Sequence, residues 1–126
     1  MRIDRLDHLV LTVADMAASL AFYRDVLGMT EQTFGEGRKA VAFGSSKINL
    51  HDAAAPVEPH ARRPTPGSAD LCVVVDGPLD DVAAELRAAG VPIEIGPVER
   101  TGARGTIESL YVRDPDANLV ELSVYR

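Results

Sequence analysis

The same order of expected strands and helices occurs twice along the chain, and this repetition constrains the fold more than any other feature. In each half, an apolar β-branched run precedes a segment with helical spacing, which a glycine (Gly28 or Gly90) closes. The first half is expected to hold a strand at 6–13, a helix at 16–27 and strands at 29–34, 39–43 and 47–51. The second half is expected to hold a strand at 70–75, a helix at 79–89 and strands at 91–95, 106–112 and 119–125. The sequence therefore predicts an α+β fold of two βαβββ modules that form a paired-sheet cleft.

The length of 126 residues fits one domain, so residues 1–126 are expected to fold together. The modules are expected at about 1–53 and 68–126. Between them, residues of about 54–67 are rich in alanine and proline and show no hydrophobic period, which predicts a linker.

Composition excludes several classes of function. No apolar run approaches the ~20 residues that span a bilayer, and the first residues do not resemble a signal peptide. A net charge of −6 argues against nucleic-acid binding, which needs a basic surface. The single cysteine, Cys72, suits a reducing compartment, and its apolar neighbours predict a buried, unreactive thiol. We therefore expect a cytoplasmic protein that binds neither membranes nor nucleic acid.

Four ionisable residues lie within otherwise apolar strands: His8, His51, Asp70 and Glu121. Burying a charge without a partner is costly, so each of these residues needs an explanation. His8 and Asp70 belong to the first strands of the two halves, and His51 and Glu121 to the last strands. Imidazole and carboxylate together suit a divalent ion such as Zn²⁺, Ni²⁺, Co²⁺, Mn²⁺ or Fe²⁺. The set predicts a metal site.

Taken singly, these residues also fit simpler roles. His51 ends its strand and can be exposed, and Asp70 can be a turn residue. Asn49 and His51 face the same side of their strand, so either can be the residue nearer the metal. We prefer His51, because imidazole is a better ligand than an amide, and leave Asn49 as a substrate contact.

The segment at 96–105 is expected to be a flexible loop that carries two guanidinium groups, Arg100 and Arg104. These groups can clamp a substrate carboxylate or phosphate. A solvated loop without function explains them equally well.

Four stretches resemble a known family: DHLVLTVADMAASLAFYRDVLGM at 7–29, FGSSKINLHD at 43–52, GSADLCVVV at 67–75 and VRDPDANLVELSVY at 112–125. With these stretches the chain resembles the vicinal oxygen chelate superfamily, which includes glyoxalase I, bleomycin-resistance proteins and extradiol dioxygenases. The resemblance is nearest to glyoxalase-domain members of the virulence type. It implies a glyoxalase-like fold with a divalent metal held at the ends of paired strands.

The resemblance also implies roles for individual residues. His8 falls on the first-strand ligand of the family and Glu121 on its last-strand carboxylate ligand. Asn49 or His51 falls on the fourth-strand ligand. Asp70 departs from the pattern, because the family has a histidine there. Ala117 replaces the glycine usual in the DPDGN turn.

The expected function is that of a glyoxalase-like lyase or isomerase that binds two adjacent oxygens of a small-molecule substrate through the metal. In this interpretation Glu121 and Asp70 carry the catalysis, and either Asp70 or a metal-bound water moves the proton. Two alternatives remain: an Fe²⁺ ring-cleaving dioxygenase, and a metal-free protein that sequesters a drug or toxin. By family analogy we expect a homodimer.

Overall fold

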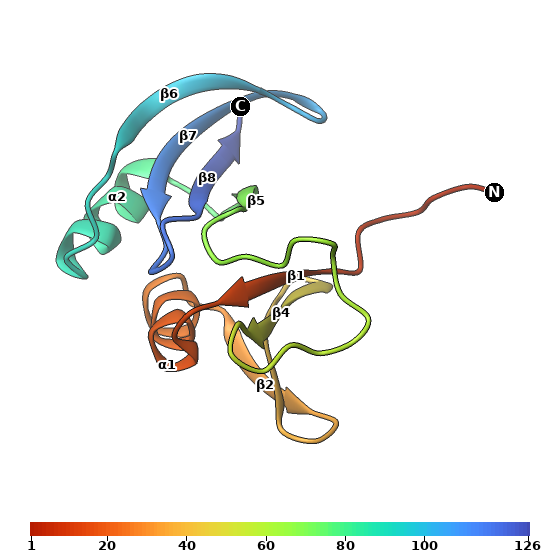
Figure 1. Cartoon of the computed structure of the whole chain (residues 1–126). Coiled ribbons are helices and arrows are strands. Elements are labelled where there is room, and N and C mark those ends of the chain that lie inside the picture. The colour runs from red at the N-terminus through yellow and green to blue at the C-terminus, as the bar shows by residue number, and fades with distance from the viewer. The chain divides into compact units, whose positions relative to one another are not determined.

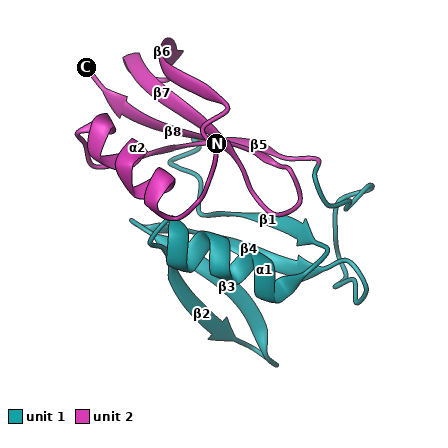
Figure 2. Ribbon diagram, turned by 90° about the vertical axis from the view of Figure 1, so that its left-hand side faces the viewer, with its two compact units in different colours: residues 1–67 teal, residues 68–126 magenta.

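A computed structural model describes all 126 residues of the chain. The chain divides into two compact units, residues 1–67 and residues 68–126 (Figure 2). The segment expected as a linker belongs to the first unit by this division. None of the helices combines the length and the hydropathy that crossing a lipid bilayer requires.

The first unit contains one helical segment and a four-stranded sheet (Figure 1). Its elements are β1 (His8–Val13), α1 (Met16–Leu20), η1 (Ala21–Val26), β2 (Thr30–Phe34), β3 (Arg38–Phe43) and β4 (Ser46–Asp52). The strand order is β1-β4-β3-β2, in which β1 is parallel to β4 and the other pairs are antiparallel. The predicted order of one strand, one helix and three strands is confirmed.

Asp15 starts the helical segment, because its carboxylate Oδ1 accepts a hydrogen bond from the Ala18 N–H over 3.1 Å. After α1 the helix widens into the π-helix η1, where the Leu27 N–H donates to the Phe22 carbonyl five residues earlier. Gly28 then ends it with a φ of +76°. The single helix predicted over 16–27 is therefore one continuous segment of two helical types.

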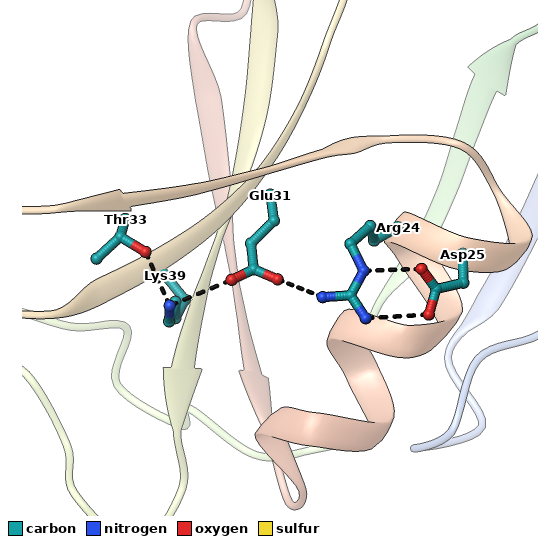
Figure 3. Close-up of polar contacts among 5 residues, drawn as sticks. All are labelled: Arg24, Asp25, Glu31, Thr33 and Lys39. Carbon is teal, nitrogen blue, oxygen red and sulfur yellow. Dashed lines mark hydrogen bonds and ion pairs between the residues drawn. The ribbon is translucent and has the colours of Figure 1, made fainter.

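A chain of ion pairs ties η1 to the β2–β3 hairpin (Figure 3). The guanidinium of Arg24 grips both carboxylate oxygens of Asp25 and donates through Nη1 to Glu31 Oε1 over 2.5 Å. Glu31 accepts a second bond from Lys39 Nζ over 3.2 Å, and Lys39 in turn donates to Thr33. These contacts fix where the helical segment meets the hairpin.

Apolar side chains on one face of the first sheet pack against α1 and η1. The buried set is Leu11, Val13, Leu20, Phe22, Tyr23, Val41, Ile48 and Leu50. The rings of Phe22 and Tyr23 meet edge to face at 5.0 Å. The opposite face, which no helix of the unit covers, carries His8, Val10, Asn49 and His51, because strand side chains alternate. We call it the helix-free face of the first unit.

The second unit repeats the plan. Its elements are β5 (Asp70–Val74), α2 (Leu79–Ala88), β6 (Ile95–Gly102), β7 (Gly105–Arg113) and β8 (Leu119–Tyr125). The strand order is β5-β8-β7-β6, with β5 parallel to β8 and the other pairs antiparallel. The predicted α+β fold of two βαβββ modules is confirmed.

The prediction for residues 91–105 was wrong. Residues 96–102 are not a flexible loop: they form most of β6, which pairs with β7 and leaves only a tight turn around Ala103 and Arg104. The Gly96-Pro97 pair broke the strand pattern in the sequence, but β6 is an edge strand and accommodates the pair at a shift of register between Ile95 and Val98. Arg100 is therefore a strand residue.

Leucine and valine side chains on one face of the second sheet pack against α2. The buried set is Leu79, Ala83, Leu86, Leu110, Val112, Val120 and Leu122. The opposite face carries Cys72, Arg100, Ser109, Tyr111, Glu121 and Ser123, as the strand registers require. We call it the helix-free face of the second unit, and it carries most of the chemistry described below.

Candidate functional site

Glu121 lies in the middle of β8 on the helix-free face of the second unit, where it is partly buried. Its carboxylate Oε2 accepts a hydrogen bond of 2.6 Å from Ser109 Oγ and a longer one of 3.3 Å from Ser123 Oγ. Ser109 and Ser123 are completely buried and lie directly opposite each other on β7 and β8. The carboxylate is thus held by one of its two oxygens.

Cys72 lies directly across from Glu121 on the edge strand β5. The prediction of a buried thiol was wrong: the residue is exposed, because alternation turns Cys72 away from α2. Its sulfur lies 3.2 Å from Ser123 Oγ. Desolvation of the sulfur raises the pKa of Cys72, the bond to Ser123 opposes this, and the charge of Glu121 raises the pKa further.

Tyr111 is the residue of β7 that lies opposite Glu121. Its hydroxyl accepts a hydrogen bond from Arg100 Nε over 3.1 Å, and the guanidinium of Arg100 also stacks on the ring. Burial raises the pKa of Tyr111, Arg100 lowers it, and hydrogen bonding to Glu121 raises it again. Arg100 is thus held by Tyr111 at a fixed place beside the carboxylate.

A cavity of about 410 Å³ opens on this face of the second unit. Its lining includes Cys72, Arg100, Ile107, Glu121 and Tyr125. A carboxylate, a thiol and a guanidinium therefore line one cavity together with apolar side chains, the combination expected of a small-molecule site.

The second predicted guanidinium, Arg104, lies in the β6–β7 turn rather than in a flexible loop. Its guanidinium stacks on Tyr125 at 5.2 Å, and its backbone N–H donates to the Tyr125 hydroxyl. Tyr125 and Ala103 line the cavity, whereas Arg104 does not. Arg104 therefore shapes the rim of the cavity through Tyr125.

Asp70 is the first residue of β5 and is exposed. It pairs with Leu119 of β8, two residues before Glu121, and so lies on the same face as Glu121. The two predicted carboxylates are thus on neighbouring strands of one sheet.

His8 begins β1 on the helix-free face of the first unit. Its Nδ1 lies 2.7 Å from Asp7 Oδ2, and hydrogen bonding to His8 lowers the pKa of Asp7. A carboxylate on one ring nitrogen of a histidine orients the ring and leaves the other nitrogen for a ligand. Sequence reasoning missed Asp7, although its place directly before His8 was visible.

Asn49 and His51 lie on β4, on the same face of the first sheet as His8. Asn49 is 4% exposed, and its Oδ1 is buried without a hydrogen-bond partner. His51 Nε2 is also buried without a partner. The proline-rich segment of the first unit meets His51 around a small cavity that Pro56, His60 and Pro64 help to line.

Burial lowers the pKa of His51, and the positive charges of Arg38 and His60 lower it further. His51 is therefore held in its neutral form, the form that binds a metal.

Neither unit by itself brings together three or more His, Cys, Asp and Glu side chains in an arrangement that would hold a metal ion. Groups of each unit, taken separately, nevertheless have the chemistry of ligands for a divalent cation. Asn49 Oδ1 is a buried oxygen without a donor, His8 has one ring nitrogen oriented by Asp7, and Glu121 is held by one oxygen.

On the helix-free face of the second unit, sequence reasoning missed three polar residues, Ser109, Ser123 and Tyr111. All three occupy alternate positions on β7 and β8 that face the same way as Glu121. The alternation of SLYVR and VELSV could have predicted these residues. In both segments a polar residue recurs at every second place between buried leucines and valines.

Comparison with known proteins places the chain in a family. The profile of the Glyoxalase/Bleomycin resistance protein/Dioxygenase superfamily matches residues 5–122. The virulence protein STM3117 of Salmonella typhimurium is 56% identical over 125 residues, which cover 99% of this chain and 87% of that protein. Its crystal structure matches with a TM-score of 0.98 over the full length of both chains.

Two further proteins match nearly the whole of this chain. The glyoxalase domain-containing protein RDO1 of Mycosarcoma maydis is 52% identical over 96% of this chain and 68% of its own length. The crystal structure of lactoylglutathione lyase from Agrobacterium tumefaciens matches with a TM-score of 0.74 at 25% identity, over 98% of this chain and 95% of that one. The chain therefore belongs to the glyoxalase/bleomycin resistance protein/dioxygenase superfamily.

Proposed function

We propose that the protein is a metal-dependent, glyoxalase-like enzyme that acts as a lyase or isomerase on a small substrate with two adjacent oxygens. The observation that carries the proposal is the carboxylate of Glu121, which two buried serines hold at a cavity that Arg100 also lines. Such a pre-oriented carboxylate suits a metal ligand or a general base. One relative that matches nearly the whole chain is a lactoylglutathione lyase, which supports the choice of lyase chemistry.

We propose His8 and Glu121 as metal ligands, with His51 or Asn49 completing the set. A divalent cation bound there would supply Lewis-acid stabilisation of negative charge on the substrate oxygens. Asp7 orients the ring of His8, and Ser109 orients the carboxylate of Glu121. These contacts form before any substrate arrives, so they add no cost of reorganisation to the reaction.

The remaining roles fall to residues of the second unit. Asp70 is exposed on the same face as Glu121 and is proposed to move the proton. Arg100 is proposed to hold an anionic part of the substrate, since Tyr111 fixes the guanidinium at the cavity. Arg104 is proposed to act indirectly, by supporting the Tyr125 wall. The volume of about 410 Å³ suits a ligand of small size.

The test is metal analysis of protein purified without chelator, for the wild type and for His8→Ala and Glu121→Ala. We expect about one divalent ion per chain in the wild type and its loss in both variants. Glu108→Gln is the matched control. Glu108 pairs with Arg126, so this variant should keep the metal.

Three outcomes would contradict parts of the proposal. Retention of metal in both His8→Ala and Glu121→Ala would remove these residues from the ligand set. Iron as the bound metal together with oxygen-dependent ring cleavage would favour a dioxygenase. Tight binding of a drug-like ligand by metal-free protein would favour sequestration.

A further inference from the structure

The donors among Ser109, Ser123 and Cys72, which lie beside Glu121, can be assigned one by one, because each hydroxyl or thiol has a single proton. An ionised carboxylate only accepts, so Ser109 Oγ donates its proton to Glu121 Oε2, over 2.6 Å. Ser109 then has no proton left for Ser123, and the 2.7 Å contact between the two hydroxyls must be donated by Ser123. Its alternative acceptor, Glu121 Oε2, is farther away at 3.3 Å.

The same count of protons identifies the donor in the contact between Cys72 and Ser123. Ser123 has given its proton to Ser109, so the 3.2 Å contact between Cys72 Sγ and Ser123 Oγ must be donated by the thiol. The raised pKa of Cys72 agrees with a thiol that keeps its proton. Every proton from Cys72 to Ser109 thus points towards Glu121, and bonds arranged in this way strengthen one another.

The first unit has no such arrangement at the matching place. Asn49 occupies the position in the first sheet that Glu121 occupies in the second. Asn49 pairs with the third residue of β1, and Glu121 pairs with the third residue of β5. Two residues further along β4 stands His51, where β8 has Ser123, and Asn49 Oδ1 has no donor at all. The serine pair is therefore not required by the repeated fold, and it accompanies the carboxylate.

We infer that Ser109 and Ser123 are positioning residues: Ser109 holds Glu121 by Oε2 in one orientation for metal binding, Ser123 holds Ser109, and Cys72 is the terminal donor of this series of bonds. The inference rests on the proposed function for the role of Glu121 as a ligand. Both serines are completely buried, so no solvent competes for these bonds. Outer contacts of this kind usually change metal affinity by about 10- to 100-fold.

The first experiment measures Co²⁺ affinity by spectroscopic titration of the full chain. Ser109→Ala should weaken binding by about tenfold and the double variant Ser109→Ala/Ser123→Ala by more, whereas Ser109→Thr, which restores the hydroxyl, should recover most of the affinity. The matched control is Ser19→Ala. Ser19 is also completely buried and its Oγ has no hydrogen-bond partner. The Co²⁺ affinity of the Ser19→Ala variant should therefore stay within about twofold of the wild-type value. Equal affinity in the double variant and the wild type would overturn the inference.

The second experiment uses the metal-free chain and separates this inference from the proposed function. Methylene order parameters of the Glu121 side chain, measured by NMR, should be high in the wild type and in Ser19→Ala and should fall in the double serine variant. If the wild type binds no metal, the proposed function fails and this measurement alone decides the inference. An unchanged order parameter in the double variant would show that the serines do not hold Glu121.

Discussion

Asn49 of β4 and Glu121 of β8 occupy the same place in their respective sheets. Asn49 pairs with Val10, the third residue of β1, and Glu121 pairs with Cys72, the third residue of β5. By the same register His8 corresponds to Asp70. Each is the first residue of its strand, His8 pairs with the residue two places before Asn49, and Asp70 pairs with the residue two places before Glu121. The repeat therefore matches Glu121 with Asn49, and His51 with Ser123.

For the metal site proposed above, this register favours Asn49 over His51 as the ligand from β4. Asn49 Oδ1 and His51 Nε2 are both buried without a partner, but His51 also lines the cavity beside the proline-rich segment of its own unit. We expect Asn49→Ala to weaken Co²⁺ binding by at least about tenfold and His51→Ala to change it by less than about threefold. Spectroscopic titration of both variants makes the comparison. The reverse order of effects would restore the choice made on ligand chemistry alone.

Alternation and order of elements made the fold predictable from the sequence. Both βαβββ halves are as the repeated pattern of the sequence predicts. The β6 strand was missed because Gly96 and Pro97 are read locally as a break. In the sheet, Gly96 is required: a Cβ there would lie 2.4 Å from the Ser109 carbonyl oxygen. This close approach of β6 to β7 is a tertiary contact, and local sequence patterns do not reveal it.

The candidate site was predictable in its charged members only. His8, Asp70 and Glu121 stood out because a charge in an apolar strand is costly. Ser109 and Ser123 did not stand out, because a serine in a strand is ordinary until its neighbour across the sheet is known. Cys72 was misjudged for the same reason: its apolar neighbours in sequence point to the other face.

Glu31 should contribute to the acid sensitivity of the first unit. Hydrogen bonds from Lys39 and then from Arg24 hold the pKa of Glu31 below its ordinary value of 4.5. The folded state therefore binds this proton less readily than the unfolded chain, and the stabilisation is present above about pH 4.5 and lost as the pH falls below it. Glu31→Gln should be less stable than the wild type at pH 7 and should lose less stability on acidification.

Urea unfolding at pH 7, 5, 4 and 3 measures this effect. The control is Glu36→Gln, since Glu36 lies in the β2–β3 turn and makes no ion pair with Arg24 or Lys39. Parallel pH curves for the wild type and Glu31→Gln would show that the network of Figure 3 contributes nothing to acid sensitivity.

Ala117 should be a site of gain in stability. It has a φ of +64° in the turn between β7 and β8, where an L side chain is strained. Its N–H donates to the Asp114 carbonyl and its own carbonyl accepts from Arg113, so the turn holds Ala117 in this conformation. Ala117→Gly should raise the free energy of unfolding by about 1 kcal/mol, as measured by urea denaturation. The control Ala84→Gly, on the exposed side of α2, should lower it by about 1 kcal/mol, and a loss of stability in both would refute the assignment of strain.

Cys72 should react slowly despite its exposure. Desolvation and the charge of Glu121 raise the pKa of the thiol, and only the thiolate is nucleophilic. At pH 8, iodoacetamide should therefore modify the folded chain several-fold more slowly than it modifies the urea-unfolded chain, as followed by mass spectrometry. Glu121→Gln removes the neighbouring negative charge and should speed the reaction, whereas Glu108→Gln should not, because Glu108 alternates to the other side of β7. A Cys72 that reacts equally fast in the wild type and in Glu121→Gln would mean that the thiol and the carboxylate do not interact, and the chain of donors would then have to end at Ser123.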